Sequence, residues 1–238
     1  MFYKRSKDED RPASAHNGKL LWCPFAEISE QQMKTRGKYR NGYPEGAIVH
    51  YTAGRRPGGI SWGVKQGYCY FMIQGDGNVI QSFPLDRWGS HAGRSHYPGY
   101  GDWVSQYFVG IEIACAGNLT SDVDGEFESW FGTTIPPEEV RIVKENDKNQ
   151  KRGYYEKFTM AQEMSLITLL LWLHRNNPKV FKMESVLGHD EVAPTRKTDP
   201  GGSLFCDMHT FRTFLKANAW RKAEKWKRDY KMMTTAKV

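Results

Sequence analysis

The fourteen residues from position 188 to position 201 constrain this chain more than any other part of its sequence. They read Gly-His-Asp-Glu-Val-Ala-Pro-Thr-Arg-Lys-Thr-Asp-Pro-Gly and set His189, Lys197 and Asp199 in a fixed order. A neutral imidazole and a carboxylate are both good zinc ligands, and a lysine beside them adds a mobile positive charge. One His and one Asp would mean little in a chain with seven histidines, because an Asp before Pro usually caps a turn.

A second histidine lies far upstream, at the end of an apolar run. The sequence from Ala47 reads Ala-Ile-Val-His-Tyr-Thr-Ala-Gly, which predicts a buried β-strand over residues 45–53 that carries His50. The end of a strand is a rigid place for a ligand, although a lone histidine is more commonly a hydrogen-bonded core residue. With His189 and Asp199 it would supply two imidazoles and one carboxylate, which leaves the open fourth position of a catalytic zinc.

One carboxylate stands inside an apolar segment. Residues 107–116 predict a core strand in which Glu112 follows Val-Gly-Ile and precedes Ile-Ala. Apolar neighbours raise the pKa of a carboxyl group and suit it to proton transfer. The alternation of side chains along a strand also allows Glu112 to face outward, and Lys197 could equally be a solvated surface lysine.

Several segments have clear local signals. Residues 68–74 and 78–83 are strand-like runs around Gly-Asp-Gly-Asn, which predicts a β-hairpin. Thr159 is placed to cap a long apolar helix over residues 160–176, and a proline follows that helix closely. A further helix is expected from about Met208, with a basic extension that runs toward Tyr230.

Five motifs in the chain resemble, in the same order, those of the zinc-dependent N-acetylmuramoyl-L-alanine amidases. The resemblance covers residues 45–118 and 158–216, and five ordered motifs are hard to obtain from a different fold. It implies an α/β domain in which a central mixed β-sheet is flanked by helices on both faces. The motifs are Val-His-Tyr-Thr-Ala-Gly from Val49, Gly-Asp-Gly-Asn-Val-Ile-Gln from Gly75, Trp-Gly-Ser-His-Ala-Gly from Trp88, Val-Gly-Ile-Glu-Ile from Val109, and the stretch 188–201.

The resemblance also implies roles for the residues in these motifs. One Zn²⁺ would be bound by His50, His189 and Asp199, since the third ligand is Asp in the cytosolic enzymes and Cys in several phage enzymes. Cys206 is the only nearby sulfur and comes seven residues too late. Glu112 would be the general base, and Lys197 would stabilise the oxyanion.

Other motif residues are expected to contact the substrate. His91 is interpreted as a substrate contact, Trp88 as a stacking surface for a sugar or a core residue, and Arg94 as a partner for a peptide carboxylate. In some relatives a tyrosine before the hairpin acts as the base. That position is Cys69 here, which favours Glu112 and leaves its neighbours Tyr68 and Tyr70 as packing residues.

Length and composition fit one large domain with appendages. Of the 238 residues, we expect 1–20 to be a flexible polar arm, 21–218 the zinc amidase domain with a rim insertion at about 119–157, and 219–238 a basic C-terminal helix. No apolar run approaches the ~20 residues of a membrane span, and the N-terminus lacks the apolar segment of a signal peptide. We therefore expect synthesis in the cytoplasm without the usual secretory route. The four cysteines lack a C-x-x-C spacing and should be reduced.

The net charge of +7 is concentrated near the C-terminus. Trp220, Ala223, Trp226, Tyr230 and Met233 recur at helical steps among basic residues, which predicts a basic amphipathic helix. Its aromatic side could dock on the core, and its basic side could bind an anionic cell-envelope surface. The sequence contains no recognised nucleic-acid-binding motif, so nucleic acid is not expected as a partner.

These features favour a monomeric enzyme that hydrolyses the amide between N-acetylmuramic acid and L-alanine in peptidoglycan or muropeptides. The basic helix favours a lytic enzyme, such as a phage endolysin, that reaches peptidoglycan after release from the cytoplasm. A cytosolic enzyme of muropeptide recycling would have the same site. A module that binds peptidoglycan without cleaving it, or a simple binder of anionic polymers, would leave the complete set of His50, His189, Asp199, Glu112 and Lys197 unexplained.

Overall fold

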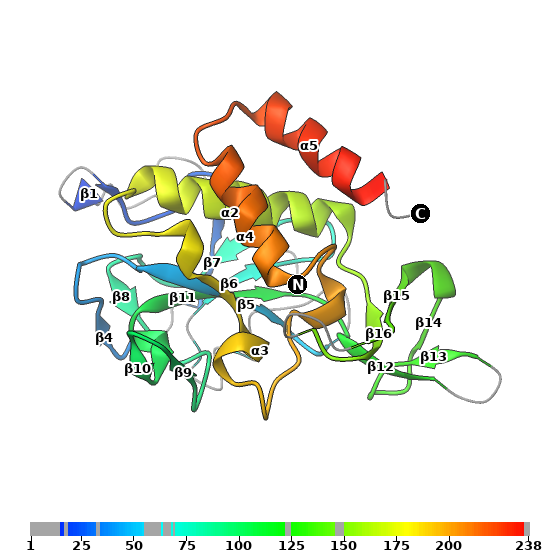
Figure 1. Ribbon diagram of the computed structural model, residues 1–238. Helices are drawn as coiled ribbons and strands as arrows, with labels where there is room; N and C mark the ends of the chain where they lie inside the picture. Colours follow the sequence, from blue (N-terminus) through cyan, green and yellow to red (C-terminus); the bar gives the residue numbers. More distant parts are fainter. Residues whose placement is uncertain are drawn as a thin grey trace.

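A six-stranded mixed sheet forms the centre of the molecule (Figure 1). Its strand order in this computed structural model is β17-β5-β11-β6-β7-β3. Strands β17, β5, β11 and β6 run parallel, and β7 is antiparallel to β6. The strands span Val186–Gly188 (β17), Gly46–Tyr51 (β5), Phe108–Ile113 (β11), Tyr70–Ile73 (β6), Val79–Gln81 (β7) and Glu27–Ile28 (β3). The structure describes residues 15–16, 19–31, 34–54, 63, 68, 70–121, 125–145 and 150–235.

The expected hairpin and core strands are confirmed. β6 and β7 flank the turn at Gly75 to Asn78, where the Gln74 N–H donates to the Asn78 carbonyl at 2.9 Å. Gly77 takes a positive φ of 86°, a conformation that glycine adopts without steric cost. The turn therefore fixes the register of the two strands from local chemistry.

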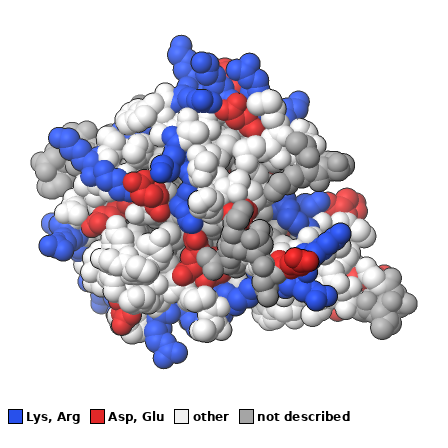
Figure 2. Space-filling model, in the orientation of Figure 1, with Lys and Arg blue, Asp and Glu red and all other residues white. Residues whose placement is uncertain are grey.

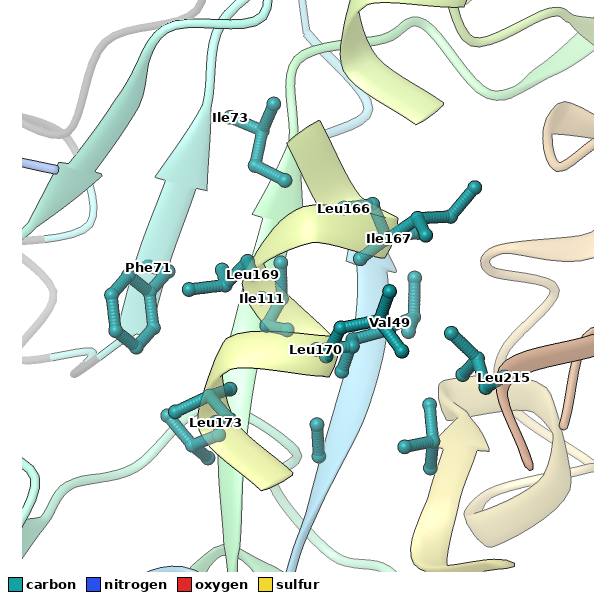
Figure 3. Close-up of a cluster of buried hydrophobic side chains, with 14 of the residues drawn as sticks. Val49, Phe71, Ile73, Ile111, Leu166, Ile167, Leu169, Leu170, Leu173 and Leu215 are labelled. Carbon is teal, nitrogen blue, oxygen red and sulfur yellow. The ribbon is translucent and has the colours of Figure 1, made fainter. Parts of the chain in front are cut away.

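Helix α2 (Met160–Asn176) covers one face of the sheet, with the bounds that its sequence predicts. The Thr159 hydroxyl accepts from the Gln162 N–H at 3.1 Å, and the Gln162 side chain accepts from the Thr159 N–H at 2.9 Å, which closes a capping box. Figure 3 shows Leu169 and Leu170 of α2 beside Ile111 and Val49 of the sheet. Each large aliphatic side chain buried in this way contributes about 1.5–3 kcal/mol.

The other face of the sheet is covered mainly by short elements and loops. Ile48, Phe108 and Leu187 alternate with the residues that face α2, and they form a separate cluster with Val104 and Val192. Helix α3 (His189–Val192) and the 3-10 helix η2 (Val104–Gln106) lie on this side. Two-stranded pairs border it: β4 (Gly37–Lys38) with β8 (Arg87–Trp88), and β9 (His96–Tyr97) with β10 (Gly101–Asp102).

Most of the expected insertion forms a second, five-stranded antiparallel sheet beside the first (Figure 1). Its own apolar cluster contains Leu119, Ile135 and Val140. The strand order is β14-β13-β12-β16-β15, and the strands span Thr134–Ile135 (β14), Phe127–Glu128 (β13), Asn118–Ser121 (β12), Gly153–Glu156 (β16) and Val140–Val143 (β15).

The C-terminal region forms two helices, where the sequence had suggested one helix with an extension. Helix α4 (Met208–Asn218) begins where predicted, with the Asp207 side chain as its N-cap. Helix α5 (Ala223–Thr235) follows a break, and its Trp226 and Tyr230 are buried against the core. Two of the aromatic residues expected to dock on the core, Trp226 and Tyr230, therefore do so. Trp220 and Ala223, which were predicted to lie on the same side of the helix, are exposed.

Part of the N-terminal arm is ordered into a small hairpin. Strands β1 (Ala15–His16) and β2 (Lys19–Leu20) pair, and the Leu20 carbonyl accepts from the Asn176 side chain at 2.8 Å. The remainder of residues 1–18 lies outside the described residues. Among the helices that the structure describes, none combines the length and hydropathy that crossing a bilayer requires.

Candidate metal centre

Two neighbouring parallel strands bring the two predicted histidine ligands together. His50 lies in β5, and His189 is the first residue of α3, directly after β17. Strands β5 and β17 pair with Gly188 opposite Val49, so their carboxyl ends meet at one edge of the sheet. Asp199 returns to the same point because its carbonyl accepts from the Asp190 N–H at 2.8 Å.

Three ligand atoms converge in this buried corner. His50 Nδ1 lies 2.9 Å from His189 Nδ1 and 3.1 Å from Asp199 Oδ2, and His189 Nδ1 lies 2.9 Å from the same oxygen. All three residues are buried. Among the described residues they are the one group of His, Cys, Asp or Glu side chains arranged to hold a metal ion.

The outer hydrogen bonds of the histidines decide which nitrogens carry lone pairs. His189 Nε2 lies 3.0 Å from the Ala92 carbonyl, which can only accept, so Nε2 carries the proton and Nδ1 the lone pair. Burial and the neighbouring His189 lower the pKa of His50 to about 4, so its ring is neutral near pH 7. Converging lone pairs repel one another unless a cation or a proton lies between them, so this donor set fits a metal ion.

His91 lies behind His50 and extends this arrangement. Its Nε2 donates to the Phe108 carbonyl at 2.9 Å, which leaves its Nδ1 to accept from His50 Nε2 at 3.0 Å. The His50 Nδ1 lone pair then points toward His189 and Asp199. Burial also lowers the pKa of His91 well below its ordinary value, which keeps its ring neutral. His91 therefore has a clear positioning contact that the sequence did not reveal, although it also lines the cavity described next.

The corner that holds these candidate ligands opens into a cavity of about 710 Å³. Lys197 and Glu112 both line it, as do Tyr68 and Tyr70, so the tyrosines that were expected only to pack also face this space. The backbone carbonyl of Lys197 accepts a hydrogen bond from Nζ of Lys151 at 3.0 Å, and Lys151 lies two residues before β16 of the second sheet. The cavity thus combines the candidate metal ligands with the acidic side chain of Glu112 and the basic side chain of Lys197.

Glu112 occupies the strand position next to His50. The two residues are direct partners in the β11–β5 pairing. The Glu112 Oε2 atom is buried and has no hydrogen-bond partner among the described residues. Burial, followed by the negative charge of Asp199, raises the pKa of Glu112 well above its ordinary value, and the charge of Lys197 opposes this shift. A carboxylate in this setting is suited to accept a proton.

Two of the predicted substrate contacts are not among the cavity-lining residues. Trp88 lies in β8, where it pairs with Gly37. Arg94 is exposed, and its carbonyl accepts from the Arg196 guanidinium at 2.8 Å. Arg196 and Trp130 line the cavity instead. Arg196 could have been noticed because it stands next to Lys197, whereas no local signal marks Trp130.

Comparisons with known proteins agree with this geometry. Residues 40–202 match the sequence family described as N-acetylmuramoyl-L-alanine amidase. The chain is 27% identical over 144 residues to the 1,6-anhydro-N-acetylmuramyl-L-alanine amidase AmpD of Enterobacter cloacae, covering 60% of this chain and 54% of that protein. It is 24% identical over 147 residues to AmpD of Salmonella typhimurium, covering 62% of this chain and 56% of that protein. The chain thus spans about half the length of these curated relatives.

A solved structure supports the fold. The crystal structure of a selenomethionine derivative of AmpD superposes with a TM-score of 0.53 at 20% identity. The superposition covers 82% of this chain and 96% of that one. At this level of identity the likeness establishes a shared architecture of sheet and helices.

Proposed function

Because the chain belongs to the N-acetylmuramoyl-L-alanine amidase family, we propose that it hydrolyses the amide bond between N-acetylmuramic acid and L-alanine in peptidoglycan. The observation that carries this proposal is the convergence of His50, His189 and Asp199 at the floor of an open cavity. Two imidazoles and one carboxylate suit zinc and leave a position open, as catalytic zinc sites do.

The remaining groups of the cavity supply the rest of the chemistry. Bound zinc would polarise the amide carbonyl and make water more acidic. Glu112 accepts a proton from the attacking water and delivers it to the leaving amine, and its raised pKa suits both transfers. Lys197 offsets the negative charge that develops on the carbonyl oxygen. His91 holds the ring of His50 in the tautomer that the metal requires.

The names of the relatives suggest a narrower substrate. Both curated relatives are described as acting on 1,6-anhydro-N-acetylmuramyl-L-alanine. The exposed basic surface of α5 favours a different setting (Figure 2). It suits an enzyme that is released from the cell and acts at an anionic cell envelope. We propose the lytic setting, with the chain acting as a monomer, and treat preference for the anhydro sugar as a second candidate.

The test compares wild type with His189→Ala on purified sacculi and on 1,6-anhydro muropeptide, with and without a chelator. Wild type should contain about one zinc per chain and release stem peptides from sacculi, as measured by mass spectrometry. Chelation and His189→Ala should abolish both zinc binding and release. His209→Ala, which removes an exposed histidine of α4, is the matched control and should behave like wild type.

Three results would contradict the proposal. Full zinc content and full activity in His189→Ala would show that the ligands are wrong. Binding of sacculi without release of stem peptides would identify a recognition module. Cleavage of only the anhydro substrate would favour the recycling setting over the lytic one.

A further inference from the structure

An exposed indole lies at the wall of the cavity. Trp130 lies in the turn between β13 and β14, and 74% of its surface is exposed. It nevertheless lines the same cavity as His50, His189 and Asp199. Because an aromatic side chain this exposed does little for the core, its position calls for another explanation.

The turn that carries Trp130 is held firmly. Ser129 is buried, and its N–H donates to the Thr133 carbonyl at 2.9 Å. The Thr133 N–H donates to the Ser129 hydroxyl at 2.9 Å, and the Gly132 N–H donates to the Ser129 carbonyl at 2.9 Å. Phe131 turns inward and packs on the apolar cluster of the second sheet. This arrangement leaves Trp130 to face outward from a rigid base.

The indole itself is also fixed in place. Trp130 Nε1 donates to the Ala53 carbonyl at 2.6 Å, three residues beyond His50. Ala53 has a positive φ of 49°, an uncommon conformation for a residue other than glycine. The ring of Phe131 meets the indole edge-on, with centroids 5.5 Å apart. The one polar atom of the indole is therefore already bonded, and a π face is what it can offer to a ligand.

The charge of the cavity indicates which part of a substrate this face would contact. With Lys197 assigned to the carbonyl oxygen, Arg196 is the basic side chain of the cavity that suits a carboxylate of the stem peptide. The face of an aromatic ring is electron-rich, so it disfavours carboxylates and attracts the weakly positive C–H groups on one side of a sugar ring. We propose that Trp130 is a stacking platform for the sugar on the carbonyl side of the scissile amide. This inference rests on the proposed amidase function and assigns the sugar contact to the second sheet.

The enzymatic test uses two substrates that differ only in the sugar. One is an N-acetylmuramoyl peptide, and the other is the matching D-lactoyl peptide, which keeps the amide and lacks the ring. Trp130→Ala should lower kcat/KM about tenfold for the first substrate and leave the second unchanged. Trp130→Phe keeps an aromatic face but cannot donate to Ala53, so it should stay within about threefold of wild type. Trp220→Ala removes a tryptophan that is 69% exposed outside the cavity and serves as the control.

Each alternative gives a different pattern. Equal losses on both substrates would assign the indole to the peptide and overturn the proposal. Equal losses in Trp130→Phe and Trp130→Ala would show that the indole merely ties the hairpin to Ala53. Unchanged kinetics in Trp130→Ala would show that the indole contacts nothing in the substrate.

A binding measurement keeps this test separate from the proposed function. The indole N–H signal of Trp130 is identified in ¹⁵N spectra as the one that Trp130→Phe lacks. Titration with N-acetylmuramic acid should shift that signal, and titration with the stem peptide alone should not. If wild type cleaved neither substrate while the sugar still shifted the signal, the amidase proposal would fail and the platform would stand. A signal that the sugar leaves unmoved would overturn the platform.

Discussion

The six-stranded sheet and the five-stranded sheet both contribute to the cavity, but they present side chains of opposite kinds. At the edge of the first lie His50, His189 and Asp199, which are 1%, 2% and 4% exposed. The second supplies Trp130, which is 74% exposed. Buried polar groups must be satisfied by neighbours and are therefore held in one geometry, whereas an exposed ring is free to contact a ligand. Changes near the first sheet should thus affect metal and turnover, and changes in the second should affect substrate choice.

Among variants that keep the three candidate zinc ligands, the largest effect is expected from Glu112→Gln. This variant keeps the shape of the side chain but removes the proton acceptor, so kcat should fall by roughly 10²-fold or more while zinc is retained. Because burial raises the pKa of Glu112, wild-type activity should also be lost as the pH falls through that raised pKa, where the carboxylate becomes protonated. Rates measured across pH, together with zinc content, test both points.

Glu128→Gln on β13 is the matched control, because it neutralises an exposed carboxylate of the second sheet. It should leave kcat close to wild type. Near-normal turnover in Glu112→Gln would move the role of base elsewhere, and Tyr68 and Tyr70, which line the cavity, would be the next residues to replace.

A smaller effect is expected from His91→Ala. This variant removes the acceptor for His50 Nε2, so the ring of His50 is no longer held in one tautomer and one orientation. Zinc affinity should therefore fall by about 10–100-fold. Competition with a chelator of known affinity measures this directly. His96→Ala, in which the lost ring had paired with the exposed Asp102, should change nothing. A raised KM with unchanged zinc affinity would restore the sequence-based interpretation of His91 as a substrate contact.

The smallest effect concerns the basic surface of α5 (Figure 2). Because Trp226 and Tyr230 are buried, removing the helix would expose the core. A loss of lysis could then come from lost packing or from lost binding to an anionic surface. Replacing the exposed Lys225, Arg228 and Lys231 with Gln leaves that packing intact. Lysis of permeabilised cells should fall a few-fold, most strongly at low salt, with hydrolysis of soluble muropeptides unchanged.

The control for this variant removes the same charge elsewhere. Arg36, Lys38 and Arg40 are exposed around β4, and their replacement with Gln lowers the net charge equally. If both triple variants lost lysis to the same extent, net charge alone would explain the effect. If neither did, the proposed role of α5 at an anionic surface would be wrong.

Much of the fold followed from local patterns in the sequence. The bounds of α2 follow from a capping residue and an apolar run that ends near a proline, and the β6–β7 hairpin follows from its glycine-containing turn. These signals act between residues close in sequence, so they can be interpreted without the tertiary structure. The break between α4 and α5 was missed because Trp220 continues the helical spacing of aromatic residues, although its side chain does not reach the core.

The candidate site divides in the same way. The sequence alone singled out His50, His189 and Asp199, because the order of the motifs and the residue types that bind metals can be recognised in a sequence. The fold brings the three residues together. The positioning contact of His91 and the place of Trp130 were decided only by the tertiary structure. Both depend on atoms that the fold brings together from distant positions: His91 lies 41 residues from His50, and Trp130 lies 77 residues from Ala53. Hydrogen bonds depend on separation in space and on direction, and a sequence pattern records neither for residues so far apart.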